Sequence, residues 1–230
     1  MGIEYLTPDE IRQNQESIQK NIAHQPNYFV RSGDVRRLTS KYCSPEDKIL
    51  EVGCGSGDMA RTMIADGYTN ISAVDIGNYL SDDLKDKIDL HEADICFEKF
   101  PVKDSSLDVI FAIAIIEHLE NPLLIVREAA RTLKKHGKFI IAIPHIHSLR
   151  SKWEFARRGD VKGFNEGNNH ITLQTQAVFK KTYLKDFRLI ETIYSAGYMK
   201  LFGRKLSFNK NSWWFNKYFA DKVLYVLEKK

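Results

Sequence analysis

The sequence predicts an α/β fold in which helices cover both faces of a doubly wound, mostly parallel sheet. From Ile49 onward, short apolar runs alternate with helical patterns, and this alternation is typical of such a sheet. In the run Asp108–Ile113, every residue after Asp108 is apolar, as expected for a strand that is buried on both faces. Glycines at alternate positions follow the first strand in ILEVGCGSGD, residues 49–58, where a chain of this fold approaches its ligand most closely.

Length and composition favour a single domain. With 230 residues and 43% hydrophobic content, the chain can bury one sizeable core but is short for two. We expect an N-terminal helical lid over 1–44, a cofactor-binding core over 45–144, and a substrate loop, the last helix and terminal strands over 145–230. The sequence shows neither a run of about 18 apolar residues nor a signal-peptide pattern, so we expect a cytoplasmic protein.

The first elements are predicted from apolar periodicity and capping residues. Thr7–Glu10 has the pattern of a capping box and predicts a surface helix that extends to about Ala23. Strands are expected near 48–52, 70–75, 87–91, 107–113 and 138–143, and helices near 57–66 and 122–135. The second of these helices should carry three basic residues in its last turn, namely Lys134, Lys135 and His136.

The pattern changes after Pro144. Residues 144–173 have no clear period and are rich in His, Asn, Gly, Arg and Lys, and so long a loop in a compact domain is usually functional or disordered. A helix near 174–185, a strand near 187–195 and a last strand near 221–228 are expected beyond it. An aromatic stretch over 198–219 separates these two strands.

Net charge and cysteine content exclude few classes of function. A net charge of +4 with a pI of about 8.8 suits an anionic ligand but falls short of a nucleic-acid signature. The cysteines Cys43, Cys54 and Cys96 show neither a CxxC pair nor a zinc-ligand spacing, so we expect reduced thiols and no metal site among them.

The glycine turn favours a nucleoside ligand that lacks a diphosphate. The dinucleotide pattern GxGxxG would require glycine where Asp58 stands, and a carboxylate there would face a pyrophosphate at the helix N-terminus. Asp75 ends the second strand and could accept hydrogen bonds from ribose hydroxyls. Asp94 follows the third strand and could accept from an adenine amino group while Ile95 packs on the ring. Either aspartate could instead cap the loop that follows it.

These residues together resemble the class I S-adenosylmethionine-dependent methyltransferases, in particular small-molecule enzymes of the type 11 and type 23 groups. The matching segments are ILEVGCGSG, AVDIG, EADI, LDVIFAIAIIEHLENP and GKFIIAIP, and they cover about residues 45–144. The resemblance implies a Rossmann-like sheet of seven strands with a terminal antiparallel hairpin, and S-adenosyl-L-methionine as the cofactor. It assigns cofactor contacts to Glu51, Gly53, Cys54, Gly55, Gly57, Asp75, Ile76, Asp94, Ile95, Ala112 and Ile113. Ala114 stands where many relatives carry a polar side chain.

Histidines near the expected acceptor site are the candidate catalytic residues. A hydroxyl acceptor needs a base, and histidine titrates near neutral pH. His145 and His147 fall at the end of the fifth strand, His170 lies in the long loop, and His118 follows the fourth strand. Any one of them could instead have a structural role, as a cap or in packing.

Two clusters allow alternative interpretations. The basic residues Arg150, Lys152, Arg157, Arg158 and Lys162 could form a solvated face or hold a phosphate or carboxylate of the acceptor. The aromatic residues Trp213, Trp214, Phe215, Tyr218 and Phe219 are expected in the core or in a dimer contact. Contact with a membrane surface is the less favoured alternative.

The sequence therefore predicts methyl transfer to a small-molecule acceptor. The composition of the loop over 144–173 resembles that of methyltransferases encoded with surface-polysaccharide genes. This resemblance favours O-methylation of a sugar or of another anionic or glycosylated metabolite. The alternative is a non-catalytic protein that binds the cofactor and holds a partner through its aromatic segment. Nucleic acid is not expected, because Ile116–Leu119 stands where an Asn/Asp-Pro-Pro-aromatic segment would be. A monomer or a homodimer fits equally well.

Overall fold

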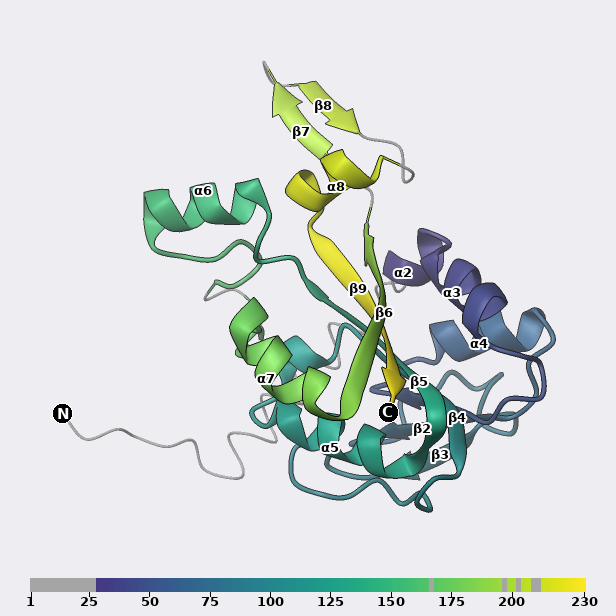
Figure 1. The fold of residues 1–230 in the computed structure, drawn as a ribbon. Helices are drawn as coiled ribbons and strands as arrows, with labels where there is room; N and C mark the ends of the chain where they lie inside the picture. Colours follow the sequence, from purple (N-terminus) through teal and green to yellow (C-terminus); the bar gives the residue numbers. More distant parts are fainter. Residues whose placement is uncertain (1–27, 166–167, 196–197, 202–203, 208–211) are drawn as a thin grey trace.

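A seven-stranded sheet forms the centre of the protein in a computed structural model (Figure 1). The structure describes residues 28–165, 168–195, 198–201, 204–207 and 212–230. The surface helix predicted to extend to Ala23 lies outside these residues.

The parallel part of the sheet contains the five predicted strands. They are β1 (Ile49–Val52), β2 (Ile71–Asp75), β3 (Asp89–Glu92), β4 (Leu107–Ile113) and β5 (Leu133–Pro144). The strand order is β3-β2-β1-β4-β5-β9-β6, so β1 pairs with β2 on one side and with β4 on the other. The order reverses at β1, and ligands of open α/β sheets bind at such a point, beyond the carboxyl ends of the strands.

The last two strands of the sheet are antiparallel, as predicted. Strand β9 (Lys222–Lys229) lies between β5 and β6 (Phe187–Tyr194) and pairs antiparallel with both. Lys222 pairs with Pro144, which brings the start of β9 to the carboxyl end of β5. Chain segments that are far apart in sequence thus meet at the edge where the ligand is expected.

Helices pack on both faces of the sheet (Figure 1). One core contains buried side chains of α5 (Pro122–Thr132) and α7 (Gln176–Asp186), and η1 (Ile116–His118) adjoins it. The other core contains side chains of α2 (Tyr28–Arg31), α3 (Asp34–Tyr42) and α4 (Asp58–Ala65). The doubly wound, Rossmann-like architecture is therefore confirmed.

One predicted boundary is wrong. The helix expected over 122–135 ends at Thr132, and β5 begins at Leu133. Leu133 is fully buried and pairs with Leu107, and Lys134 forms an ion pair with Asp108 at 2.7 Å. Burial of Leu133 outweighs the local helical pattern, so Lys134 and Lys135 lie in β5 and His136 has a φ of 66°.

The segment expected to lack regular structure contains a helix, α6 (Leu149–Arg158). Ser148 caps its start by accepting a hydrogen bond from the Ser151 backbone N–H at 3.1 Å. Gly159 ends it with φ 79°, a conformation that glycine adopts at little cost. The aromatic stretch holds α8 (Trp213–Phe219) and the small hairpin of β7 (Tyr198–Leu201) and β8 (Arg204–Ser207). None of the helices in the described residues has the length and apolar character needed to cross a membrane.

Candidate active site at the carboxyl edge of the sheet

The glycine turn after β1 requires glycine for two independent reasons. Gly53, Gly55 and Gly57 have φ values of 71°, 50° and 81°, which side chains with a Cβ adopt at a cost. A Cβ on Gly53 would lie 2.6 Å from Cγ1 of Ile115, and a Cβ on Gly57 would lie 2.6 Å from Cδ1 of Leu84. The turn is therefore a close-packed cradle in which backbone groups face the carboxyl edge of the sheet.

Asp75 is tied to this turn. Its Oδ2 accepts a hydrogen bond from the Gly55 backbone N–H at 2.9 Å, and its Oδ1 accepts from the Ile76 backbone N–H at 2.8 Å. Each carboxylate oxygen can accept more than one hydrogen bond, so both retain capacity for a ligand hydroxyl. Burial raises the pKa of Asp75 above its usual value, although the two backbone hydrogen bonds oppose the shift. The structure brings together Asp75 and the glycines, which the sequence placed at one site.

Glu51 is a buried carboxyl group at the end of β1. It is 5% exposed, and its Oε2 has no hydrogen-bond partner among the described residues. Burial raises its pKa to about 8, the backbone of Ala60 opposes this shift, and the nearby Asp75 and Asp58 add to it. An acidic group that is buried close to two other carboxylates favours a ligand with positive charge.

The other predicted cofactor residues surround the same edge. Cys54 is buried in the turn, and Ala112 and Ile113 are buried at the end of β4. The Oδ1 of Asp94 accepts from the Cys96 backbone N–H at 2.9 Å, which is the local capping role that the sequence left open. Ile95 is buried in the core below this turn.

Ile115 is a site residue that the sequence analysis missed. Ala114 has φ 55°, and its N–H donates to the Ala142 carbonyl at 3.0 Å. This turn directs the Ile115 side chain onto Gly53. In the sequence, Ala114 after the fourth strand is the feature that could have indicated this turn. A small side chain suits a tight turn but does not predict a positive φ.

A second polar cluster contains Glu117, His118 and His170. One carboxylate oxygen and one ring nitrogen from each histidine lie within 4.8 Å of one another, and the two imidazole rings meet edge to face with centroids 4.7 Å apart. Burial raises the pKa of Glu117 to about 7. Burial, assisted by His170, lowers the pKa of His118 to about 4. His118 and His170 were candidate catalytic residues of the sequence analysis, whereas Glu117 occurred there only within the segment LDVIFAIAIIEHLENP.

His145 and His147 form a separate pair, with ring centroids 6.3 Å apart. The Nε2 of His145 lies 2.8 Å from the Lys217 carbonyl and must carry the hydrogen of that bond. The His145 backbone N–H donates to the Asp221 carbonyl at 2.8 Å. Burial lowers the pKa of both histidines. These contacts join the end of β5 to α8 and the start of β9.

Two of the five basic residues of the loop region stabilise the fold. Arg150 lies 3.1 Å from Asp221, and Lys162 forms an ion pair with the same carboxylate. Lys152, Arg157 and Arg158 are exposed. The basic run therefore divides into a structural part and a solvated part.

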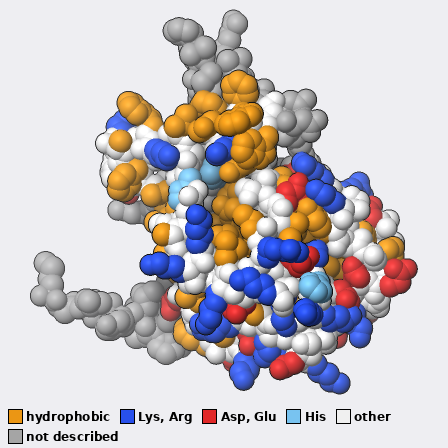
Figure 2. Space-filling view, in the orientation of Figure 1, with side chains coloured by type: hydrophobic (Ala, Val, Ile, Leu, Met, Phe, Trp, Pro, Cys, Tyr) orange, Lys and Arg blue, Asp and Glu red, His pale blue; other side chains and the backbone are white. Residues whose placement is uncertain are grey.

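Most aromatic residues of α8 lie on the surface, so the predicted place in the core is wrong for them, whereas the alternative, a dimer contact, stays a prediction. Trp213, Trp214 and Phe215 are 45%, 66% and 54% exposed. On α6, Trp153 and Phe155 are 70% and 58% exposed. Hydrophobic side chains gather at the end of the molecule that holds α6 and α8, with basic side chains among them (Figure 2). The fully buried side chain of α8 is that of Asn216.

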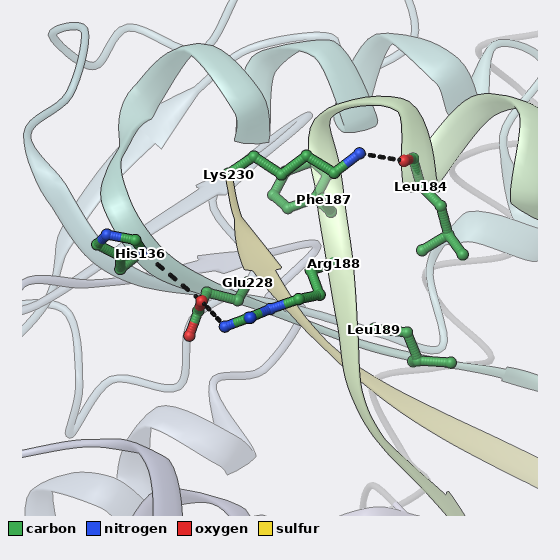
Figure 3. Close-up of a pocket in the computed structure, with 7 residues that line it drawn as sticks. All are labelled: His136, Leu184, Phe187, Arg188, Leu189, Glu228 and Lys230. Atoms are coloured by element: carbon green, nitrogen blue, oxygen red, sulfur yellow. Dashed lines mark hydrogen bonds and ion pairs between the residues drawn. The ribbon is translucent and has the colours of Figure 1, made fainter.

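A pocket at the other edge of the sheet is structural. Its lining includes Phe187, Arg188 and Glu228 (Figure 3). Glu228 forms ion pairs with Lys138 at 2.8 Å and with Arg188 at 2.6 Å. Lys138 begins the paired part of β5 with β9, so this pocket lies at the amino ends of the parallel strands, away from the glycine turn.

Comparisons with known proteins point to one family. Residues 50–141 match the family described as methyltransferase domain. An uncharacterized protein of Methanocaldococcus jannaschii is 26% identical over 151 residues, which are 65% of this chain and 70% of that protein. A Mycobacterium tuberculosis protein, named a probable S-adenosylmethionine-dependent methyltransferase, is 31% identical over 128 residues. That alignment covers 52% of this chain but only 43% of the mycobacterial protein.

Solved structures share the fold. An S-adenosylmethionine-dependent methyltransferase of Thermotoga maritima superposes with a TM-score of 0.60, covering 95% of this chain and 97% of its own. The two sequences are 17% identical, so this likeness establishes the architecture and leaves the acceptor open.

Proposed function

Because the chain belongs to the class I S-adenosylmethionine-dependent methyltransferases, we propose that it methylates a hydroxyl group of a small sugar-containing or anionic metabolite. The observation that supports the methyl-transfer part is the glycine turn bonded to Asp75 beside Glu51, whose Oε2 has no hydrogen-bond partner among the described residues.

The described residues fit S-adenosyl-L-methionine, the cofactor of the family. The Asp75 oxygens can accept further hydrogen bonds, which suits the ribose hydroxyls. Glycine at positions 53 and 55 adopts the positive φ values and places no side chain in the cradle. The carboxyl groups of Glu51 and Asp75 suit a ligand with cationic groups. When bound, this cofactor supplies an electrophilic methyl group on a sulfonium sulfur. Ala112 and Ile113 would pack against its methionine part.

The protein's main contribution would be alignment of the acceptor with that methyl group. An unactivated hydroxyl must also lose its proton, and we favour His118 among the candidate histidines. Its Nδ1 lies 3.2 Å from the Asn169 carbonyl, so that nitrogen donates and Nε2 keeps its lone pair. His145, by contrast, uses the Nε2 hydrogen in a structural bond to Lys217. His147 is half-buried and remains a candidate for contact with the acceptor.

The preference for a sugar or an anionic acceptor rests on the residues around α6. The exposed cations Lys152, Arg157 and Arg158 lie on a helix that follows the carboxyl end of β5. Guanidinium and ammonium groups bind phosphate and carboxylate oxygens well. A sugar nucleotide or a phosphorylated glycan would combine a hydroxyl acceptor with such an anion.

Radiolabelled S-adenosylmethionine would test this acceptor class. The protein is incubated with labelled cofactor and with separate sugar-nucleotide, glycolipid and neutral small-molecule fractions. We expect base-stable label, typical of an ether, in a phosphate-bearing sugar fraction. Label confined to amines or to neutral lipids would contradict the proposed acceptor while leaving methyl transfer intact.

The exposed aromatic surface supports a second candidate function, a protein that binds the cofactor and a partner without catalysis. Trp214 and Trp153 are each at least 66% exposed, and monomeric surfaces rarely present large apolar patches without a role. In that case, cofactor would bind, no fraction would accept label, and Trp214→Ala with Trp153→Ala would abolish association with the partner. Transfer of label to any acceptor by the double variant would favour the enzyme.

A further inference from the structure

We propose that Glu117, His118 and His170 form a site for a divalent transition-metal cation such as Zn²⁺ or Co²⁺. The ligand atoms already lie within 4.8 Å of one another. Zinc binds histidine nitrogen and carboxylate oxygen at about 2.0–2.2 Å, so the three atoms would need to approach one another by roughly 1 Å. Two imidazoles with one carboxylate form a donor set that suits Zn²⁺, Co²⁺ and Fe²⁺ better than Mg²⁺.

Unpartnered polar atoms point to a missing ligand at this place. Glu117 is 2% exposed, and its Oε2 has no hydrogen-bond partner among the described residues. The Nδ1 of His170 is also buried without such a partner. Buried polar groups are nearly always hydrogen-bonded. A cation between these atoms would satisfy both.

The surroundings hold the ligands in the orientation that metal binding requires. The Asn169 carbonyl accepts from Nδ1 of His118 at 3.2 Å, which fixes the tautomer with Nε2 free. Metal-binding histidines commonly donate their other ring N–H to a carbonyl in this way. This carbonyl comes from the residue next to His170, so the same stretch of loop supplies one ligand and orients another.

The loop itself is anchored to the 3₁₀ turn. The backbone N–H groups of Ile171 and Thr172 both donate to the Glu117 carbonyl, at 2.8 and 3.1 Å. The Thr172 hydroxyl donates to the Leu119 carbonyl at 2.5 Å. These bonds lie one and two residues from His170, so the position of its ring is set by the backbone of the segment that carries the other two ligands.

Lys222 is the charge that opposes a cation here. Its ammonium group is mostly buried, and its electrostatic interaction with Glu117 favours its charged form, while burial lowers its pKa. The Tyr183 hydroxyl also faces Glu117 and lacks a partner among the described residues. A bound cation would compete with this ammonium group for the Glu117 carboxylate.

With a metal bound, His118 would be a ligand and not the base, and the metal would activate the acceptor hydroxyl, a step that rests on the proposed function. Three protein ligands leave coordination positions open, and a hydroxyl in one of them ionises more readily. Its proton leaves to solvent. The oxygen electron pair then forms the C–O bond to the methyl carbon, and the S–C bond breaks with its electrons passing to sulfur, which becomes a neutral thioether.

Metal titration of the full chain, prepared without a histidine tag and dialysed against a chelator, tests the site. Calorimetry with Zn²⁺ and visible absorption with Co²⁺ should show one tight site per chain. Glu117→Gln and His170→Gln should each weaken it at least about 100-fold, because even residues that only orient a ligand contribute about 10–100-fold. The exposed His136, which lines the pocket at the other edge, provides the control. His136→Ala should bind as the wild type does.

A second readout separates this inference from the proposed function and from misfolding. Each variant is also titrated with S-adenosylhomocysteine and melted with and without Zn²⁺. Retained cofactor affinity with loss of the metal-induced rise in Tm supports the site. Absence of saturable metal binding by a wild type that binds S-adenosylhomocysteine overturns the metal site and leaves methyl transfer standing. Metal binding that is unchanged in both variants overturns it as well.

Discussion

We propose that residues 45–144, the cofactor half, bind the cofactor and that residues 145–230, the acceptor half, bind the acceptor, and the two halves hold their polar side chains in different ways. In the cofactor half, strand ends place the groups, and Asp75 is bonded to backbone N–H groups of the turn beside it. In the acceptor half, contacts between distant segments place them, as when His145 bonds to Lys217 and His170 packs on His118. The first arrangement follows from local sequence and sheet pairing, whereas the second depends on tertiary contacts.

This difference predicts the largest loss of stability at the glycine turn. Gly53→Ala adds a positive-φ side chain and a 2.6 Å contact with Ile115, so the free energy of unfolding should fall by about 2–5 kcal/mol. Gly33 has φ 73°, but a Cβ there would meet none of the described residues within 4 Å, and Gly33→Ala should cost only about 1 kcal/mol. Urea unfolding compares the two. Equal losses would mean that close packing at Gly53 is unimportant.

The next effect concerns Glu51 and depends on pH. Its native pKa of about 8 exceeds the ordinary value of 4.5. Stability from the neutral form is therefore fully present below about pH 4.5 and is lost as pH rises through 8. Relative to Glu51→Gln, which does not titrate, the wild type should lose about 2 kcal/mol or more of unfolding free energy between pH 5 and 8.

Urea unfolding of both proteins at several pH values measures this difference. Parallel pH profiles for the wild type and Glu51→Gln would show that Glu51 is ionised at neutral pH in the free protein. The carboxyl group would then have a partner that satisfies its charge.

In the acceptor half, His145 should behave as a structural residue. His145→Ala removes the bond to the Lys217 carbonyl, which is only part-buried, at a cost of about 1 kcal/mol. His147→Ala, at a half-buried neighbour, should cost less. The pH profile of methyl transfer distinguishes a structural role of His145 from a role as base. We expect His145→Ala to keep the wild-type profile, and a profile that changes only in this variant would make His145 the base.

The smallest effect should come from Asp221, which pairs with both Arg150 and Lys162. Its side chain is 37% exposed, so solvent weakens the pairs, and Asp221→Asn should cost about 0.5–1 kcal/mol. The exposed Asp160→Asn is the matched control. High salt should remove most of the difference between the two variants, and a difference that persists in salt would indicate hydrogen bonding as its main source.

The same contrast explains how far the sequence analysis reached. The parallel strands and the meeting of Asp75 with the glycines were predictable, because a strand that is buried on both faces has a continuous apolar signal. The end of α5 was not predictable from the sequence, because the pairing of Leu133 with Leu107 overrides a helical pattern. The exposed face of α8 was missed because aromatic residues alone do not show which side of a short helix is covered. The partnership of Glu117 with His170 joins residues 53 positions apart through loop contacts that have no periodic signature.

Calorimetric titration of S-adenosylhomocysteine into the wild type and Asp75→Ala tests the central claim most directly. Asp75 accepts two backbone hydrogen bonds at the glycine turn and is assigned to the ribose. We expect micromolar affinity in the wild type and a loss of about 1–3 kcal/mol in the variant, the scale of a hydrogen bond to a charged group. The exposed Asp89→Ala, at the amino end of β3, should bind as the wild type does. No binding by the folded wild type, or equal binding by Asp75→Ala, would contradict the assignment of this turn to the cofactor.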